Sequence, residues 1–389
     1  RSEMSNHVTR RSLVLGSPAA ALLAWQAASA GPAAPVPVPV PAPAPVPSSA
    51  PAGGLARLIA NENPYGPSAS ARRAVTESLA TAWQYPIGKE QPLKQLIAAR
   101  EGLTPDHVMI ADGSGEILRI AGLVFGLAAD GSGRREVVAA KPTFGFLQDY
   151  ARQLGATVTE IPLDVAMRHD LDALTAAVTA RTGLLYICNP NNPTGTMVPG
   201  PELRPFVQAM AGRTTVLVDE AYLDLWDDWP AHTLTDRVRA GDPVIVTRTF
   251  SKLHGLAGLR IGYALAPPAV IQRLEQHRMT FLGAAGVAAA TASYQDLEFQ
   301  AFSRARLQES LAMTTGTLRD LKRPYVANGR GNFVFFDTGG PLATFSAAMR
   351  REGYMVGRPF PPYDTWCRVS MGTVEQMRGF AAALTAYFR

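Results

Sequence analysis

The stretch GLLYICNPNNPTG, residues 183–195, runs from a continuous apolar segment directly into a turn of asparagine, proline and glycine. An apolar run of this length, bounded by turn residues, is typical of a strand that is buried on both faces of a sheet. Similar runs recur along the chain with helical patterns between them: HVMIADGS (107–114), EVVAAKP (136–142), TVLVDEAY (215–222) and PVIVTRTFS (243–251). This alternation predicts an α/β fold with a parallel sheet covered by helices on both faces.

The length and composition of the chain limit its function. Its 389 residues, 47% of them hydrophobic, can bury a large core and can form more than one domain. The formal net charge is +5, from 37 basic and 32 acidic residues. No basic run interleaved with aromatic residues indicates a nucleic-acid surface, so we expect no nucleic-acid partner.

The first 30 residues are typical of an export signal. Arg10 and Arg11 precede an apolar run, and the segment ends in the small residues ASA (28–30). Paired arginines favour twin-arginine export, a route that carries folded proteins; an ordinary Sec signal or an anchoring helix is the alternative. We therefore expect a periplasmic or otherwise exported protein that meets a membrane only transiently, during export.

Residues 31–54 alternate proline with alanine and valine, as in PVPVPVPAPAPVP. This composition favours an extended polyproline conformation and suits a semi-rigid tether. We expect the folded body to begin near Leu55.

Polar residues follow the apolar runs at the sheet edge where parallel sheets bind ligands. Ser114 and Gly115 lie between a strand and a helical pattern, so the free N–H groups of a helix start could seat a phosphate there, although the same sequence also suits an ordinary tight turn. Asp219 ends a buried strand, where an unpaired carboxylate is costly and needs a cation. A core arginine would be the purely structural partner.

The stretch TFSKLHGLAGLRIGY, residues 249–263, combines the groups that a phosphorylated carbonyl cofactor requires. Thr249 and Ser251 supply hydroxyls, and Arg260 supplies a planar guanidinium that suits a phosphate. Lys252 supplies an amine that can form a Schiff base with an aldehyde. Pyridoxal phosphate fits this set, because it needs an amine, a carboxylate at its ring nitrogen, donors to its phenolate oxygen and an anion seat.

Seven motifs in order resemble those of fold-type I pyridoxal-phosphate-dependent aminotransferases of class I/II, and histidinol-phosphate aminotransferases in particular. The resemblance extends from Leu58 to Phe388. The motifs are NENPYGPS (61–68), YPIGKEQPLKQLIA (85–98), DGSGEIL (112–118), NPNNPTG (189–195), VDEAY (218–222), the lysine stretch and CRVSMGT (367–373).

The resemblance implies two domains. Residues 85–280 would form a large cofactor-binding domain whose mostly parallel, seven-stranded sheet is flanked by helices. Residues 281–389 would form a smaller α+β domain, joined by an N-terminal arm of residues 55–84. It also implies a homodimer with shared active sites, because Tyr85 matches a residue that reaches the cofactor phosphate of the neighbouring subunit.

The resemblance assigns a role to each matching residue. Lys252 corresponds to the Schiff-base lysine, which also moves the proton, and Asp219 to the partner of the ring nitrogen. Asn192 and Tyr222 correspond to donors to the phenolate oxygen, and Phe144 to the ring stacked on the cofactor. The phosphate-binding positions are matched by Ser114, Gly115, Thr249, Ser251 and Arg260.

The substrate positions follow from the same resemblance. Arg368 corresponds to the arginine that binds the α-carboxylate, and Tyr65 to a substrate-lining residue. Arg358 either binds a second anionic group or is solvated. The aromatic residues of VGRPFPPYDTWCRVS (356–370) either form a side-chain pocket or simply pack.

The expected activity moves an amino group between an L-amino acid, or a histidinol-phosphate-like amine, and a 2-oxo acid by a ping-pong mechanism. One alternative is a decarboxylase of the threonine-phosphate decarboxylase type, which has the same fold and cofactor. Another is a protein that holds the cofactor without turnover. Neither Cys188 nor Cys367 has a metal-ligand partner set, and the histidines lack ligand spacing, so we expect no metal.

Overall fold

The computed structural model describes residues 54–128 and 131–389, all within one compact unit. The expected export signal, residues 1–30, and the tether up to residue 53 lie outside the described residues. Within the described ranges, no helix is long and apolar enough to cross a membrane.

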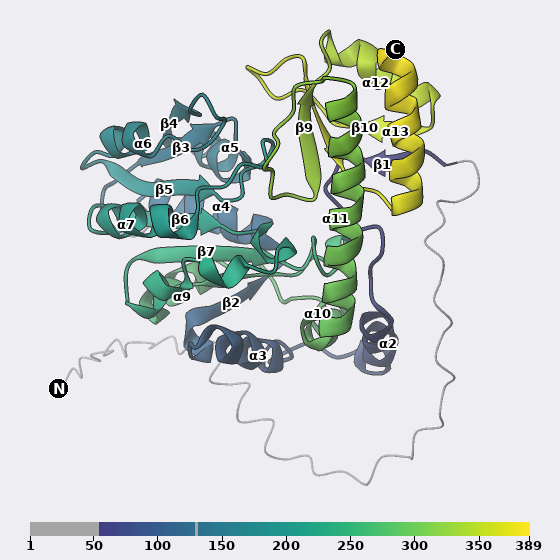
Figure 1. The fold of residues 1–389 in the computed structure, drawn as a ribbon. Helices are drawn as coiled ribbons and strands as arrows, with labels where there is room; N and C mark the ends of the chain where they lie inside the picture. Colours follow the sequence, from purple (N-terminus) through teal and green to yellow (C-terminus); the bar gives the residue numbers. More distant parts are fainter. Residues whose placement is uncertain (1–53, 129–130) are drawn as a thin grey trace, which may run out of the picture. The chain divides into compact units, whose positions relative to one another are not determined.

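A seven-stranded sheet organises the larger part of this unit, in the order β2-β8-β7-β6-β5-β3-β4 (Figure 1). Pairing from β7 through β6, β5 and β3 to β4 is parallel, and β8 runs antiparallel to both its neighbours. The predicted α/β class with a mostly parallel sheet is therefore confirmed. The strands are β2 (Val108–Ala111), β3 (Glu136–Lys141), β4 (Thr157–Pro162), β5 (Thr182–Cys188), β6 (Thr215–Asp219), β7 (Val244–Thr249) and β8 (Gly262–Leu265).

All five apolar runs form strands, whereas β4 and β8 were missed. β4 lies at the edge of the sheet, where its side chains are mostly half-buried, so it lacks a continuous apolar run. β8 has four residues and begins at Gly262, inside the lysine stretch, so it does not stand out as a separate apolar run.

Helices cover both faces of the sheet because successive strand residues point to opposite sides. Leu217 of β6 packs in the cluster that contains side chains of α4, α5 and α9, while Val216 and Val218 pack on the other face. The covering helices on the first face are α4 (Ser114–Gly126), α5 (Phe146–Gln153) and α9 (Pro268–Glu275). Those on the second are α3 (Gln91–Glu101), α6 (Leu171–Ala177), α7 (Gly200–Ala211), α8 (Thr235–Arg239) and α10 (Ala284–Gln295).

The C-terminal elements build a separate hydrophobic cluster on two small sheets. In one sheet β1 (Ala56–Leu58) pairs parallel with β10 (Tyr354–Val356), and in the other β9 (Phe333–Asp337) pairs antiparallel with β11 (Trp366–Ser370). The strand β1 thus ties the start of the described chain to its C-terminal part. The domain boundaries at residues 84 and 280 stay a prediction.

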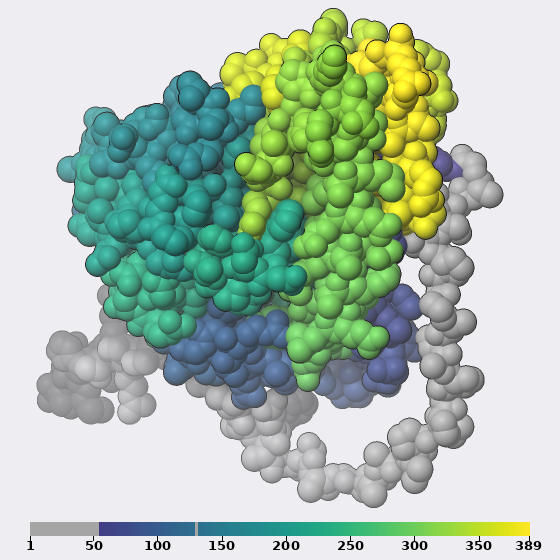
Figure 2. Space-filling view, in the orientation of Figure 1, coloured from purple at the N-terminus to yellow at the C-terminus, as the bar shows by residue number. Residues whose placement is uncertain are grey.

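The remaining helices link these layers. The 24-residue helix α11 (Leu297–Asp320) packs on α13 (Val374–Phe388) and on β9, and it forms part of the green surface in Figure 2. Helix α10 packs on α2 and α3. The remaining elements are α2 (Ala69–Ser78), α11 (Leu297–Asp320), α12 (Leu342–Arg351), α13 (Val374–Phe388) and the 3₁₀ turns η2 (Leu79–Thr81), η3 (Pro105–His107), η4 (Leu223–Leu225), η5 (Trp229–Ala231) and η6 (Ala257–Leu259).

Candidate active site

A cavity of about 460 Å³ opens where β6 and β7 end, and it gathers most of the predicted site residues. Parallel strands that end together bring their following loops to one edge of the sheet. Tyr65 and Tyr85 do not line this cavity. The predicted residues that line it are Ser114, Gly115, Phe144, Asn192, Asp219, Tyr222, Thr249, Ser251, Lys252, Arg260, Arg358 and Arg368.

One end of the cavity suits an anion. Helix α4 begins at Ser114 as predicted, so its free N–H groups and positive dipole end lie at the cavity wall. Gly262 allows this close approach, because a Cβ atom there would lie 2.6 Å from the carbonyl carbon of Gly113. Arg260, in a left-handed conformation (φ 54°), lies beside this helix start, and its Nη2 donates to the carbonyl of Asp112 at 3.4 Å.

Two hydroxyl groups complete this end. Thr249 and Ser251 are buried at the end of β7, and their side-chain oxygens lie 3.0 Å apart. Thr249 Oγ1 also accepts a hydrogen bond from the N–H of Ser251, which fixes the turn. Donors from a helix start, two hydroxyls and a guanidinium form the type of site that binds a phosphate.

Asp219 is a buried carboxylate whose charge has no ion-pair partner among the described residues. It is 2% exposed, and Thr247 Oγ1 and the Tyr186 hydroxyl donate to it at 3.0 and 3.4 Å. Burial raises its pKa to about 6. The purely structural alternative is wrong, because the nearby core arginine, Arg248, pairs with Glu220 instead. The carboxylate is therefore left to a cation inside the cavity.

The amine of Lys252 is held by the chain segment between β1 and α2. Its Nζ donates to the carbonyls of Ala60 and Asn61 at 3.2 and 3.0 Å. Burial, and next the charge of Arg368, lower the pKa of Lys252 to about 8. A large fraction of this amine is therefore neutral near pH 8, as a nucleophile requires.

Asn192, Tyr222 and Arg368 form one buried set. Asn192 Nδ2 donates to the Tyr222 hydroxyl at 3.1 Å, and Arg368 Nη1 donates to Asn192 Oδ1 at 2.6 Å. Burial raises the pKa of Tyr222 above its ordinary range, so its hydroxyl keeps its proton. In the described part of the chain, Arg368 Nε is buried without a hydrogen-bond partner, which leaves this donor to a ligand.

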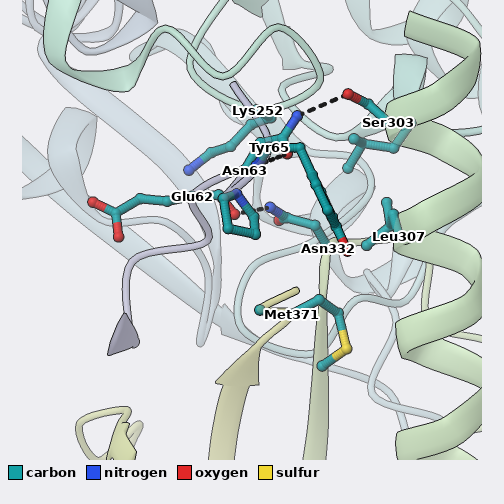
Figure 3. Close-up of a pocket in the computed structure, with 11 residues that line it drawn as sticks. Glu62, Asn63, Tyr65, Lys252, Ser303, Leu307, Asn332 and Met371 are labelled. Atoms are coloured by element: carbon teal, nitrogen blue, oxygen red, sulfur yellow. Dashed lines mark hydrogen bonds between the residues drawn. The ribbon is translucent and has the colours of Figure 1, made fainter. Parts of the chain in front are cut away.

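The two tyrosines lie elsewhere. Tyr65 lines a small cavity of about 20 Å³ beside Lys252 (Figure 3). Its hydroxyl accepts a hydrogen bond from the N–H of Val374. Tyr85 is 79% exposed and its ring centroid lies 6.0 Å from that of Phe281. An exposed Tyr85 is what a role in a neighbouring subunit's site requires, and that role stays a prediction.

The aromatic residues around Arg368 do not line the large cavity. Phe360, Tyr363 and Trp366 all pack on Phe335, with ring centroids 5.1–6.1 Å apart. They form a packed cluster rather than a side-chain pocket of that cavity. Arg358 differs from them, because it lines the cavity, with its guanidinium 4.4 Å from the Phe360 ring centroid.

Four cavity residues were not assigned from the sequence: Ala60, Asn61, Phe146 and Ala221. Phe146 stacks on Phe144 with ring centroids 4.6 Å apart. Ala60 and Asn61 line the cavity from the opposite side, and Asn61 Nδ2 donates to the Tyr222 hydroxyl at 3.0 Å. The available signal was the motif at residues 61–68, of which only Tyr65 was interpreted.

The cysteines carry no chemistry of this site. Both Cys188 and Cys367 are buried and free, and burial raises the pKa of both thiols. The described residues hold no cluster of three or more side chains able to bind a metal ion.

Residues 55–384 match the family described as aminotransferase class I and II. The chain belongs to this aminotransferase family. It is 35% identical to a histidinol-phosphate aminotransferase of Moorella thermoacetica over 332 residues, 84% of each protein. It is 34% identical to an aromatic amino acid aminotransferase of Rhodococcus jostii, over 86% of this chain and 90% of that protein.

The aminotransferase also resembles a solved structure. That structure is the histidinol-phosphate aminotransferase of Sinorhizobium meliloti in complex with pyridoxal phosphate; the TM-score is 0.77 and the identity 28%, over 86% of this chain and 91% of that one. The predicted resemblance to a fold-type I, pyridoxal-phosphate-dependent aminotransferase is confirmed. The cavity fits this cofactor, because it combines an anion seat, a carboxylate without an ion-pair partner and a lysine of lowered pKa.

Proposed function

We propose that this aminotransferase moves an amino group from an anionic amine, an L-amino acid or a histidinol-phosphate-like amine, to a 2-oxo acid. One observation carries the proposal: Arg368 and Arg358 line the same cavity as Lys252. Two guanidinium groups suit carboxylate or phosphate groups of a substrate whose amine reaches the lysine.

The residues that would hold pyridoxal phosphate follow from their chemistry. Its phosphate would bind the start of α4 with Thr249, Ser251 and Arg260, and Phe144 would cover the ring. Bound there, the cofactor supplies an electron sink that makes the α-proton of the amine labile. Asp219 keeps the ring nitrogen protonated, because a buried carboxylate without another ion-pair partner favours a cation beside it.

Lys252 would carry the proton in this reaction. Its amine lies between the ring site and the carbonyls of residues 60 and 61, and its lowered pKa lets it accept and return a proton near neutral pH. With an L-amino acid as donor, Arg368 would fix the α-carboxylate so that the α-proton faces this amine. Because donor and acceptor use one cavity, the first product leaves before the second substrate binds, which predicts ping-pong kinetics.

Arg358 would select substrates that carry a phosphate, or a second carboxylate besides the α-carboxylate. Arg358 is exposed and donates to the carbonyl of Pro359, so it is less constrained than the buried Arg368, which is 8% exposed. An exposed guanidinium that lines the cavity suits the phosphate of a histidinol-phosphate-like amine. This class agrees with the name of the Moorella relative.

A homodimer with shared sites is part of the proposal. Exposed apolar side chains gather near Tyr85: Trp83 is 82%, Met279 86% and Phe281 57% exposed. Large apolar side chains exposed together favour a protein partner. A second copy that covers them would bring Tyr85 to a neighbouring cofactor site.

Export stays a proposal based on residues 1–30, outside the described part of the chain. A reporter protein fused to residues 1–30 tests it, and a second fusion in which Arg10 and Arg11 are both changed to lysine is the control. If export uses the twin-arginine route, the first fusion should reach the periplasm and the second should not.

The substrate class is tested by adding single amine donors to the holoenzyme without acceptor and following the cofactor absorbance. Histidinol phosphate, an aromatic amino acid and a basic amino acid are compared, and carbon dioxide release is measured in parallel. We expect a spectral change with 2-oxo product and no carbon dioxide. Arg358→Gln should weaken histidinol phosphate binding about tenfold or more and leave monoanionic donors unaffected. Arg350→Gln, on α12 outside the cavity, is the control.

Carbon dioxide release would instead support the decarboxylase alternative. If the cofactor is bound but no donor changes its absorbance, the result would support a protein that holds the cofactor without turnover. Equal effects of Arg358→Gln on all donors would contradict the role of Arg358.

A further inference from the structure

Asn61, the first residue of the motif NENPYGPS, uses every one of its polar groups. It is 1% exposed and has a left-handed backbone (φ 54°). Its N–H donates to Ser370 Oγ and its Oδ1 accepts from the same hydroxyl, both at 2.8 Å. Its Nδ2 donates to the Tyr222 hydroxyl at 3.0 Å. Its carbonyl accepts from Lys252 Nζ at 3.0 Å and from Asn332 Nδ2 at 2.9 Å.

Ser370 determines which way the amide of Asn61 points. A serine hydroxyl has one proton, and Ser370 Oγ already accepts the backbone N–H of Asn61. Its one proton is donated to the amide oxygen of Asn61 at 2.8 Å. The amide nitrogen is left to face Tyr222.

A second amide reaches Tyr222 with its orientation equally determined. Arg368 donates to Asn192 Oδ1, so Asn192 Nδ2 is the atom that faces the Tyr222 hydroxyl. The Tyr222 oxygen thus accepts two amide N–H groups, one from Asn61 and one from Asn192. With both acceptor positions used, its own proton is left for an acceptor inside the cavity.

We propose that Asn61 and Ser370 are positioning residues for transamination, which together direct the hydroxyl proton of Tyr222 into the cavity. The acceptor there is the phenolate oxygen of pyridoxal phosphate, and in this respect the inference rests on the proposed function and on the role that the family resemblance implies for Tyr222. Ser370 ends β11, two residues after Arg368, whereas Tyr222 follows β6. The strand that carries the substrate arginine thereby also sets a hydrogen bond to the cofactor.

The inference is tested on purified holoenzyme by titrating the absorbance of the bound cofactor with pH, without substrate. Tyr222→Phe should raise the transition by about one pH unit, because the phenolate oxygen then keeps more negative charge and favours a proton on the nitrogen beside it. Asn61→Gly and Ser370→Ala should each raise it by about half a unit. Glycine is chosen because it retains the left-handed backbone and so the carbonyl contacts to Lys252 and Asn332.

Ser303→Ala is the matched control. Ser303, on α11, also holds this segment, because its Oγ accepts a hydrogen bond from Asn63 Nδ2 at 3.1 Å (Figure 3), but no hydrogen bond joins it to Tyr222. Both serines are buried, so the two alanine variants should lose similar thermal stability. Ser370→Ala alone should move the cofactor titration.

The double variants decide between a specific effect and a general loosening. In a Tyr222→Phe background, Asn61→Gly and Ser370→Ala should add no further shift, because the hydroxyl that they orient is gone. A shift that persists in this background, or equal shifts for Ser370→Ala and Ser303→Ala, would overturn the inference. If Tyr222→Phe alone moves the titration, the role of Tyr222 stands and the inference fails; if Tyr222→Phe has no effect, both fail.

Discussion

Two carboxylates that are neighbours in the chain, Asp219 and Glu220, are almost equally buried and meet opposite surroundings. Asp219 ends β6 on the cavity side and has no cation within ion-pair distance among the described residues. Glu220 lies 3.0 Å from Arg248, which also pairs with Glu101 at 2.6 Å. Burial raises the pKa of both carboxyl groups. The largest opposing effect is the charge of Arg248 for Glu220 and the hydrogen bond from Thr247 for Asp219, where the charge of Lys252 contributes less.

The difference indicates that Asp219 belongs to the ligand-binding cavity and Glu220 to the structural core. Thr233 and the N–H of Leu234 also donate to Glu220, so this carboxylate is satisfied within the fold. Asp219 receives hydroxyl hydrogen bonds but forms no ion pair with any of the described residues, so part of its desolvation cost is left for a ligand to offset. Substitutions around Asp219 should therefore change activity and cofactor binding, whereas substitutions around Glu220 should lower the free energy of unfolding.

The largest expected effect is on the cavity side. Lys252→Ala removes the proton carrier and should lower transamination by at least about 10⁴-fold. The far-ultraviolet circular dichroism should be unchanged, because the amine makes its hydrogen bonds to two carbonyls at the cavity wall. Stopped-flow or long single-turnover assays of the variant give the residual rate; turnover close to that of the wild type would disprove the assignment.

On the scaffold side, Arg248→Met should lower the free energy of unfolding by about 3–5 kcal/mol, because two buried carboxylates lose their cation. Urea unfolding of the apoenzyme measures this. Arg204→Met is the control: Arg204 pairs with Asp236 at 3.1 Å, where both side chains are partly exposed, and its loss should cost about 1 kcal/mol or less. If Arg248→Met and Arg204→Met lowered the free energy of unfolding equally, the buried ion pairs of Arg248 would have no special structural role.

Asp219→Asn should have the opposite sign in the apoenzyme. The folded-state pKa of Asp219, about 6, lies above its ordinary value of 3.8, so the wild type loses stability as the pH rises from about 4 to 6. Above this window the variant should be more stable by up to about 3 kcal/mol. Below pH 4 this advantage should vanish.

The same substitution should weaken cofactor binding and abolish most activity, since a neutral amide cannot hold the ring nitrogen protonated. Paired urea titrations at pH 4 and pH 7.5, with and without cofactor, separate the two effects. An apoenzyme that Asp219→Asn destabilises at pH 7.5 would show that this carboxylate is as well satisfied as Glu220.

The smallest expected effect concerns the shell of Asp219. Tyr186→Phe removes a 3.4 Å hydrogen bond from a fully buried hydroxyl and should raise the pKa of Asp219 slightly, worth about 0.5–1 kcal/mol. The pH dependence of apoenzyme unfolding between pH 4 and 7 measures it. Tyr294→Phe is the control, because among the described residues the buried Tyr294 hydroxyl has no hydrogen-bond partner; an equal change in both variants would exclude a specific effect.

Local sequence predicted much of this molecule. Continuous apolar runs mark β2, β3, β5, β6 and β7, because a strand buried on both faces has no polar side to interrupt it. Lys252 and Arg260 were identified for a similar reason, since a reactive amine and a guanidinium stand with glycines in one short stretch. The half-buried edge strand β4 and the four-residue β8 carry no such signal.

Long-range placement decided the rest. The sequence by itself determined the fold class, the chemical groups of the site and their order along the chain, because apolar periodicity and side-chain chemistry are local properties. Only the tertiary structure decided that no arginine in the described part of the chain pairs with Asp219, that the aromatic residues near Arg368 pack on Phe335, and that Asn61 donates a hydrogen bond to Tyr222. Each depends on contacts between residues far apart in the chain, and no local pattern specifies which of several buried polar groups will meet.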